Sequence, residues 1–320
     1  MSPPSAGVLS QVRAFAPGSV SNVGCGFDAL GFAIAGVGDE VIARRVDGSA
    51  QVSIRAIHGE GGRLPLEAGK NTAGKAALAV QSRATEAPAV ELEIFKKMPL
   101  SSGLGSSAAS AVAAVVAVDR LLGTELPSAE LLECALEGEQ IASGARHADN
   151  VAPSLLGDLL LVRSLDPEPD IVLLPCLEDL HCVVLRPDVP INTAESRRLL
   201  GDTVQLPQAI QQWANLGGFV AALYKGDAEL LSRCLIDVVA EPVRGPQVPD
   251  FARIQAAALE ARALGCSLSG SGPAIFALAL GKESAKSVAG AMNAALSAEI
   301  ERDLLVSSLP CRGAHVIEES

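Results

Sequence analysis

Residues 99–110 read Pro99-Leu100-Ser101-Ser102-Gly103-Leu104-Gly105-Ser106-Ser107-Ala108-Ala109-Ser110. The run before this loop, Val90-Glu91-Leu92-Glu93-Ile94, alternates apolar and polar residues and predicts a strand with one face in a core. The run after it, 106–122, is rich in Ala and Val and nearly free of charge, which is typical of a buried helix. The loop therefore connects a strand to the start of a helix.

This loop predicts a phosphate site. Glycine permits backbone conformations closed to other residues and lets a ligand approach the main chain. The helix start adds unpaired N–H groups and the positive end of the helix dipole. A serine cap alone would explain Ser106 or Ser107, but not two glycines and four serines together. No lysine follows the glycines, so the loop is not the Walker A loop of ordinary P-loop NTPases.

The composition argues against several classes of protein. The 320 residues exceed the roughly 250–300 that one core usually holds, which predicts two domains. A net charge of −12 argues against a nucleic-acid partner. No apolar run reaches the ~18 residues of a membrane helix, so we expect no membrane association. Seven scattered cysteines without a Cys-x-x-Cys pair indicate a reduced, cytoplasmic protein.

The remaining pattern is α+β. We expect a helix from an N-cap at Ser128 to a C-cap at Gly144. Further along, 181–186 and 274–280 predict strands, and 251–264 and 282–296 predict helices. Two prolines in 166–170 mark the expected division into domains 1–165 and 166–320, although a wide hairpin between the apolar runs 159–162 and 171–174 would explain them equally.

Two further motifs accompany the loop in a fixed order. The first is Ala16-Pro17-Gly18-Ser19-Val20-Ser21-Asn22-Val23-Gly24-Cys25-Gly26-Phe27-Asp28-Ala29-Leu30-Gly31, and the second is Gly265-Cys266-Ser267-Leu268-Ser269-Gly270-Ser271-Gly272-Pro273. Together the three motifs resemble those of the GHMP kinases. The resemblance implies a two-domain GHMP kinase fold, with an N-terminal ribosomal-protein-S5-like α/β domain that binds ATP and a C-terminal ferredoxin-like α+β domain.

Within that superfamily the chain is most similar to the homoserine kinases. The similarity rests on Asn22 with Gly-Phe-Asp28, on His147-Ala148-Asp149-Asn150-Val151-Ala152-Pro153 and on Glu241-Pro242-Val243-Arg244. Cys25 stands where the family usually has proline, which we expect to alter rigidity rather than chemistry. The resemblance implies Mg²⁺- and ATP-dependent phosphorylation of the L-homoserine hydroxyl to O-phospho-L-homoserine, a step of threonine biosynthesis, and it allows a homodimer.

The resemblance also assigns the site residues. It gives ATP the adenine contact of Asn71 and the loop residues Pro99, Leu100, Ser101, Ser102, Gly103, Leu104, Gly105, Ser106, Ser107, Ala108 and Ala109. It gives the substrate Asn22, Asp28, His147, Asn150, Thr193, Arg197 and Arg244. Asn22 and Asp28 match the ammonium site, and the arginines match the carboxylate site, for which a guanidinium fork is suited.

Catalysis is expected to depend on Asn150, Glu139 and Ser107. The resemblance makes Glu139 and Ser107 the Mg²⁺ ligands, and Mg²⁺ favours few protein ligands together with water and phosphate oxygens. An amide cannot remove a proton at neutral pH, so Asn150 orients the hydroxyl and the mechanism relies on positioning and electrostatics. We expect His147 to be a wall or orienter of the substrate site rather than a base.

The sequence disfavours three alternative functions. Another GHMP kinase, acting on mevalonate, a sugar or shikimate, is disfavoured by the two arginines and Asp28. A non-catalytic ligand-binding relative would be favoured by a broken phosphate loop or a lost Mg²⁺ carboxylate, and both are intact. A Rossmann dehydrogenase using Gly24-Cys25-Gly26 lacks the third glycine and the downstream acid.

Overall fold

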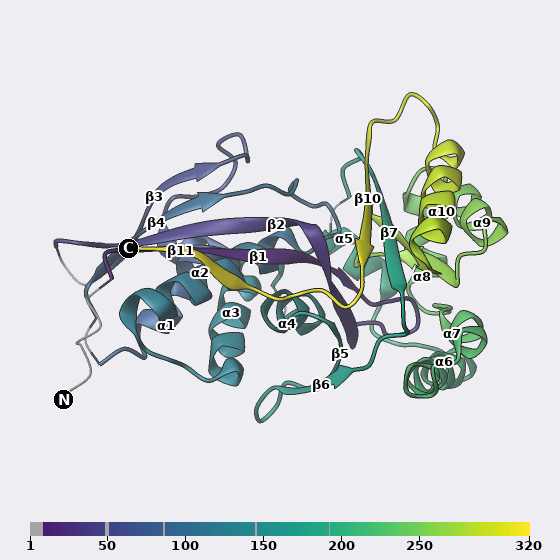
Figure 1. Ribbon diagram of the computed structural model, residues 1–320, viewed down its shortest axis with the longest axis horizontal. Coiled ribbons are helices and arrows are strands. Elements are labelled where there is room, and N and C mark those ends of the chain that lie inside the picture. Colours follow the sequence, from purple (N-terminus) through teal and green to yellow (C-terminus); the bar gives the residue numbers. More distant parts are fainter. Residues whose placement is uncertain (1–8, 49–50, 86, 145, 192) are drawn as a thin grey trace.

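The computed structural model describes residues 9–48, 51–85, 87–144, 146–191 and 193–320. These residues form two β-sheets with helices packed against them, as Figure 1 shows. None of the helices in these ranges is long and apolar enough to cross a membrane.

The first sheet has the strand order β11-β1-β2-β4-β3, and β5 and β6 extend it from β2. Its strands are β1 (Gln11–Ser21), β2 (Leu30–Val46), β3 (Val52–His58), β4 (Ala89–Phe95), β5 (Leu159–Ser164), β6 (Asp170–Leu174) and β11 (His315–Glu319). The helices on one face are η1 (Ala68–Lys70), α1 (Thr72–Gln81), α2 (Ser106–Leu122), α3 (Ser128–Ser143) and α4 (Ala148–Leu156). The long strand β2 pairs with β4 at one end and with β5 at the other.

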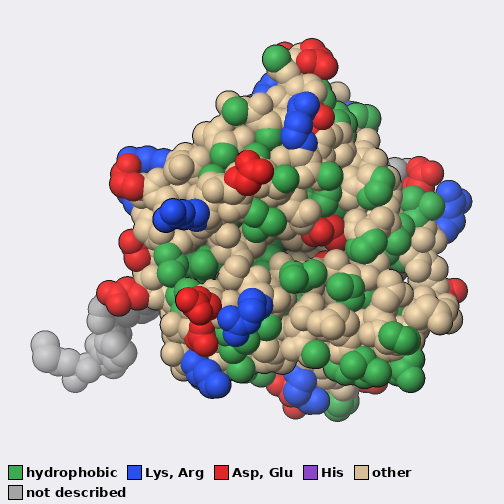
Figure 2. Space-filling model, turned by 90° about the vertical axis from the view of Figure 1, so that its right-hand side faces the viewer, with side chains coloured by type: hydrophobic (Ala, Val, Ile, Leu, Met, Phe, Trp, Pro, Cys, Tyr) green, Lys and Arg blue, Asp and Glu red, His purple; other side chains and the backbone are tan. Residues whose placement is uncertain are grey.

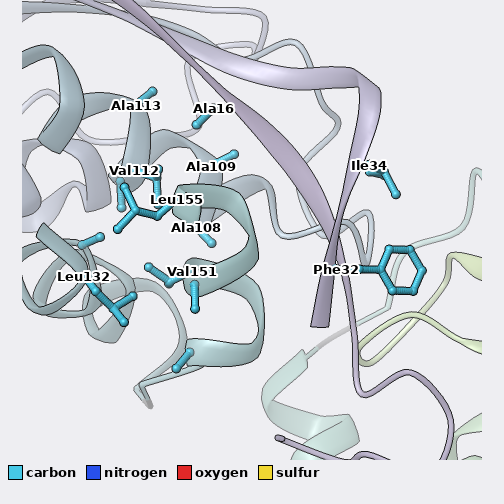
Figure 3. Close-up of a cluster of buried hydrophobic side chains, with 14 of the residues drawn as sticks. Ala16, Phe32, Ile34, Ala108, Ala109, Val112, Ala113, Leu132, Val151 and Leu155 are labelled. Atoms are coloured by element: carbon cyan, nitrogen blue, oxygen red, sulfur yellow. The ribbon is translucent and has the colours of Figure 1, made fainter. Parts of the chain in front are cut away.

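Small side chains build the core of the first domain around α2. Figure 3 shows Ala108, Ala109, Val112 and Ala113 of α2 packed near Leu132, Val151 and Leu155 of the neighbouring helices and Ala16 of β1. With aromatics at 3% of the chain, alanine lets these helices approach the sheet closely. The strand predicted over 90–94 and the helix predicted over 106–122 are confirmed as β4 and α2. Helix α3 starts at Ser128, but its N-cap is Pro127. Its predicted C-cap, Gly144, is confirmed at φ 71°.

The second sheet is antiparallel, with the order β10-β7-β9-β8. Its strands are β7 (Leu180–Pro187), β8 (Gly265–Leu268), β9 (Ile275–Leu280) and β10 (Arg302–Ser308). The remaining helices are α5 (Thr193–Leu200), α6 (Leu206–Lys225), α7 (Ala228–Cys234), α8 (Glu241–Arg244), η2 (Gly245–Gln247), α9 (Phe251–Glu260) and α10 (Lys282–Ala295). Val183 and Leu185 of β7 face the core under α9 and α10, whereas Cys182 and Val184 join the core of the first domain. Phe32 of β2 meets Phe276 of β9 edge-on at 6.0 Å, so the two domains share a continuous core.

In the structure the chain crosses from the first domain to the second at a later residue than the sequence predicted. Residues 166–169 lie in the turn between β5 and β6, which pair antiparallel, and Asp170 begins β6, so the segment 166–170 belongs to the wide hairpin. The first sheet therefore extends to Leu174, and the chain crosses to the second sheet over 175–179. In addition, β11 returns to pair with β1. The division into 1–165 and 166–320 is wrong at its boundary and at the C-terminal end, because proline composition marks a turn without saying which strands flank it.

Candidate active site

The three sequence motifs meet at the phosphate loop. The hydroxyl of Ser269 donates to the carbonyl of Gly103 at 2.6 Å, and the amide of Ser19 donates to the carbonyl of Leu104 at 3.0 Å. Gly105 has a φ of 66°. A Cβ there would lie 2.3 Å from Ser19 Oγ, so only glycine fits. Residues far apart in the sequence thus fix the loop between the two domains.

Two helix starts point their first turns at one cavity. In α2, Ser106 and Ser107 both line the cavity, and the hydroxyl of the buried Ser106 also donates to Asp39 at 3.5 Å. In α4, Asp149 and Asn150 of the first turn line the same cavity. The positive ends of both helix dipoles favour an anion there, although in α4 the amides of Ala148 and Asn150 already donate to backbone carbonyls. This local field counteracts the net charge of −12.

The cavity, of about 370 Å³, brings most of the predicted site residues together. Those that line it are Asn22, Asp28, Leu100, Ser101, Ser102, Gly103, Gly105, Ser106, Ser107, Glu139, His147, Asn150, Arg197 and Arg244. The other loop residues, Pro99, Leu104, Ala108 and Ala109, do not, and the last two are fully buried in the core. Helix α5 begins at Thr193, but the side chain of Thr193 lies outside the described part of the structure.

Asn71 serves as the N-cap of α1. Its Oδ1 accepts from the amides of Ala73 and Gly74 at 3.0 and 3.3 Å, and its Nδ2 donates to the carbonyl of Pro65 at 3.1 Å. The side chain is buried and does not line the cavity, although the next residue, Thr72, does. The adenine contact of Asn71 stays a prediction, and its hydrogen bonds point to a structural role.

The turn after β1 holds the predicted ammonium pair. Asn22, Val23 and Gly24 all have positive φ, which for a β-branched valine at 44° is a strained conformation. Asn22 holds the turn closed, because its Oδ1 accepts from the amide of Asp28 at 3.0 Å and its Nδ2 donates to the carbonyl of Gly270 at 3.0 Å. The carboxylate of Asp28 is thereby presented to the cavity.

Cys25, in the same turn, is buried as an apolar residue. Burial raises the pKa of its thiol to about 12, so the side chain stays neutral. Its carbonyl accepts from Nε2 of Gln212 on α6 at 3.0 Å. The altered rigidity expected from a cysteine at this position stays a prediction.

Two guanidinium groups of the cavity lie close to one aromatic ring. The Cζ atoms of Arg197 and Arg244 lie 5.2 and 5.3 Å from the centre of the Phe27 ring. Arg197 also pairs with Asp28. Arg244 is only 4% exposed, and its Nε has no hydrogen-bond partner among the described residues. Burial lowers the pKa of Arg244 because the charged form is desolvated, and an incoming anion would relieve that cost.

Glu139 and Ser107 fit the demands of a magnesium ion held by nucleotide phosphates. The buried carboxylate of Glu139 and the hydroxyl of Ser107 line the same cavity beside the phosphate loop. In the described ranges no group of three or more His, Cys, Asp or Glu side chains could hold a metal by itself. A set of two protein ligands suits Mg²⁺, which keeps phosphate and water oxygens. Nδ1 of His147 lies 3.6 Å from Oε1 of Glu139, and this contact raises the pKa of His147.

Comparisons with known proteins agree with this geometry. The family models for the GHMP kinases N-terminal domain and the GHMP kinases C-terminal domain match residues 71–158 and 219–298. A homoserine kinase of Chlorobium phaeobacteroides is 42% identical, over 97% of this chain and 100% of its own length. One of Xylella fastidiosa is 44% identical, over 90% of this chain and 88% of its own. The crystal structure of homoserine kinase from Cytophaga hutchinsonii superposes with a TM-score of 0.94 at 44% identity, covering 99% of this chain and 100% of that one.

The chain belongs to the homoserine kinase family of the GHMP kinases.

One cavity residue of this kinase was missed by sequence reasoning. Asp149 is completely buried, and its Oδ1 has no hydrogen-bond partner among the described residues. Burial, with repulsion from Asp28, raises the pKa of Asp149 to about 7. Its place beside Asn150 in the motif was a signal, but burial is what distinguishes it from a solvated helix-cap carboxylate.

A buried ion pair behind the loop was also missed. The Nζ of Lys96 contacts the carboxylate of Asp39 and donates to the carbonyl of Ser106 and the hydroxyl of Ser110, both at 2.7 Å. Asp39 also accepts from the amide of Lys97 at 3.0 Å. The ammonium of Lys96 is neutralised by Asp39 and fully hydrogen-bonded within the protein, so it holds the first turn of α2 of this kinase in place from behind the cavity.

Proposed function

We propose that the chain transfers the γ-phosphoryl group of ATP to the hydroxyl of L-homoserine, forming O-phospho-L-homoserine for threonine biosynthesis. The observation that carries this proposal is the division of one cavity into two halves. One half has the phosphate loop, the start of α2 and Lys96. The other has two carboxylates and two guanidinium groups, a set of charges that matches a zwitterionic amino acid.

Homoserine would bind by both its charges. Asp28 and Asp149 together favour its ammonium group, because each lies in the field of the other and gains from a cation between them. The carboxylate goes to Arg197 and Arg244. Both guanidinium groups lie against the Phe27 ring, and this contact helps to hold them in place. A neutral sugar would bring no anion to the buried guanidinium of Arg244, whose Nε has no hydrogen-bond partner among the described residues, and that favours an amino-acid substrate.

Asn150 would orient the reacting hydroxyl without acting as a base. Its Oδ1 accepts from the hydroxyl of Ser19 at 3.0 Å, so the amide offers its N–H groups to the substrate oxygen. The loop amides hold the phosphates in line with that oxygen, and Lys96 fixes the start of α2 behind them. Glu139 and Ser107 would hold Mg²⁺, which neutralises charge on the phosphate oxygens when bound. The hydroxyl proton is transferred to a phosphoryl oxygen or to water during the loose transition state.

A substrate comparison tests this proposal. ADP release from the purified chain is measured with ATP, Mg²⁺ and one of L-homoserine, mevalonate, shikimate or galactose. We expect turnover that requires both Mg²⁺ and homoserine. Turnover with mevalonate equal to or above that with homoserine would contradict the substrate and leave the kinase chemistry standing. Nucleotide binding without turnover on any of the four would favour the non-catalytic relative.

The setting of the enzyme is part of the same proposal. We expect it to act in the cytoplasm, where ATP and free amino acids are both available, with ATP as co-substrate and Mg²⁺ as cofactor. The neutral, buried thiols such as Cys25 are compatible with a reducing compartment. A homodimer, which the family resemblance allows, stays a separate prediction.

A further inference from the structure

The motif Glu241-Pro242-Val243-Arg244 contains an acidic residue that the proposed reaction does not use. Arg244 lines the cavity, whereas Glu241 does not, so the Glu241 carboxylate does not face the substrate. Figure 2 views the side of the molecule that carries much of the second domain, and charged side chains are scattered over its surface, where water solvates them. Glu241 is instead half-buried, and burial raises the pKa of its carboxyl. A carboxylate withdrawn from water needs partners, and its partners indicate its role.

Both carboxylate oxygens of Glu241 are bonded to other elements of the second domain. Oε2 accepts from the hydroxyl of Ser267, a buried residue of β8. Oε1 accepts from Nε2 of Gln255 on α9 at 2.8 Å, and the same Nε2 donates to the carbonyl of Cys266 at 2.8 Å. The Glu241 side chain therefore fastens the start of α8 to β8 and to α9.

Polar contacts set the position of α8. The helix has only four residues, and two of them, Pro242 and Val243, are exposed, so it buries little apolar surface of its own. The carboxylate of Asp237 accepts from the amides of Ala240 and Glu241 at 2.9 and 3.0 Å, which caps the first turn. The Asp237 cap stays within the segment that leads into α8, whereas the Glu241 side chain joins the helix to the sheet.

The guanidinium of Arg244 is bonded to the same segment as Glu241. Its Nη1 donates to the carbonyl of Gly270 at 3.1 Å. Arg244 follows Glu241 by three residues, and Gly270 follows Ser267 by three, so two cross-links of equal spacing join α8 to the segment 267–270. The carbonyl of Gly270 also accepts from Nδ2 of Asn22 at 3.0 Å. A shift of α8 along β8 would therefore move the Arg244 guanidinium relative to the turn that presents Asp28.

We propose that Glu241 is a positioning residue that fixes α8 against β8 and thereby aims Arg244 at the substrate carboxylate. This inference rests on the proposed function, because it requires Arg244 to bind that carboxylate. Displacement of a binding group by about 1 Å can lower the rate of an enzyme on the order of a hundredfold. The four-residue motif thus holds both the group that contacts the substrate and the group that sets its place.

Glu241 acts on Arg244 through geometry rather than charge. Burial lowers the pKa of Arg244, and the charged groups that modify this effect are Asp28, Arg197, Asp237 and Asp149. Glu241 is not one of these groups, and its carboxylate is directed to Ser267 and Gln255 instead. An uncharged side chain that keeps the two hydrogen bonds should therefore serve nearly as well.

Steady-state kinetics of substituted enzymes test the proposal. We expect Glu241→Ala to raise the KM for homoserine about tenfold while changing the KM for ATP less than about twofold, and its effect should not exceed that of Arg244→Leu. Glu241→Gln should recover most of the loss, because its amide can accept from Gln255 and donate to the Ser267 hydroxyl. The matched control is Glu260→Ala, an exposed acidic residue of α9, which should leave both KM values unchanged.

A double-mutant cycle separates positioning from general loss of structure. In an Arg244→Leu background, Glu241→Ala should change kcat/KM for homoserine less than about twofold, because the group that it positions is gone. An undiminished tenfold effect in that background, or equal increases in the KM values for homoserine and ATP, would overturn the proposal. If Arg244→Leu alone leaves the KM for homoserine unchanged, the proposed carboxylate site is wrong and this inference fails with it. If Arg244→Leu raises that KM and Glu241→Ala does not, the inference alone fails.

Ser267→Ala provides the same test with a smaller change. It removes one hydroxyl from the β8 end of the cross-link, so circular dichroism should match the wild type and the KM for homoserine should rise about threefold. Combined with Glu241→Ala, it should add nothing further, since both substitutions break one hydrogen bond. A Ser267→Ala enzyme with the wild-type KM for homoserine would overturn the proposal even where Glu241→Ala fails to fold.

Discussion

The guanidinium of Arg197 lies 2.5 Å from the carboxylate of Asp28, and both side chains line the cavity between the domains. Both are partly exposed, so the pair contributes little to stability. A bound zwitterion can replace each partner with a group of the same sign, its carboxylate for Asp28 and its ammonium for Arg197. We therefore expect the ion pair to keep the two charges in place for the proposed substrate.

Replacing either arginine should affect homoserine and not ATP. We expect Arg197→Leu or Arg244→Leu to lower kcat/KM for homoserine on the order of tenfold to a hundredfold, because a charge-assisted hydrogen bond contributes ~1.5–3 kcal/mol. The KM for ATP should hardly change. Lysine at either position should recover part of the loss, since it keeps the charge without the fork. A rise confined to the KM for ATP would remove these arginines from the homoserine site.

Glu139→Gln tests the magnesium site. Glutamine keeps the shape of the side chain and removes the charge that would hold the ion, so kcat should fall strongly and the Mg²⁺ concentration for half-maximal activity should rise. A titration of Mg²⁺ at saturating ATP and homoserine measures both. The control is Glu137→Gln, on the same helix with its side chain half-exposed. If Glu139→Gln responds to Mg²⁺ like the control variant, Glu139 is only a structural residue of α3.

The Asn150→Asp variant tests whether a general base at this position would accelerate phosphoryl transfer. We expect no gain in kcat at neutral pH, because a carboxylate beside the γ-phosphate repels it and the reaction does not wait for proton removal. The hydroxyl of Ser19 can still donate to a carboxylate oxygen, so the side chain should keep its position. A clear increase in kcat would show that proton transfer limits the reaction.

Asp149 should make stability depend on pH. Its pKa, about 7 in the folded protein, is raised by burial above the roughly 3.9 of an unfolded chain. The folded state therefore binds more protons between about pH 4 and 7, and the free energy of unfolding should fall as pH rises through that window, by at most about 1.4 kcal/mol per pH unit.

Urea unfolding of the wild type and Asp149→Asn across this range measures the effect. Asparagine does not titrate, so the variant should lack this part of the slope and gain relative stability above pH 7. Glu241, whose pKa burial also raises, is present in both proteins and cancels in the difference. Parallel curves for the two proteins would mean that Asp149 is not the titrating group.

The sequence predicted those features that depend on local pattern or on motif. Both ends of helix α2 were predicted correctly because 106–122 has almost no charge. The motifs predicted that Asp28, Arg244 and the phosphate loop share one site, and all three line one cavity. What it did not predict depends on long-range packing. Asp149 and Lys96 became site residues only through burial, which their neighbours in the chain do not reveal.

The C-terminal strand has a consequence for how the chain folds during synthesis. Strand β11 completes the edge of the first sheet beside β1, and the amide of Ser10 donates to the carbonyl of Ser320 at 2.7 Å. The ribosome therefore makes the first domain's edge strand only after the whole second domain. Until then β1 presents an unpaired edge, which invites pairing with another nascent chain. The order of translation thus makes the nucleotide domain the last of the two to be finished, although it is the first to be begun.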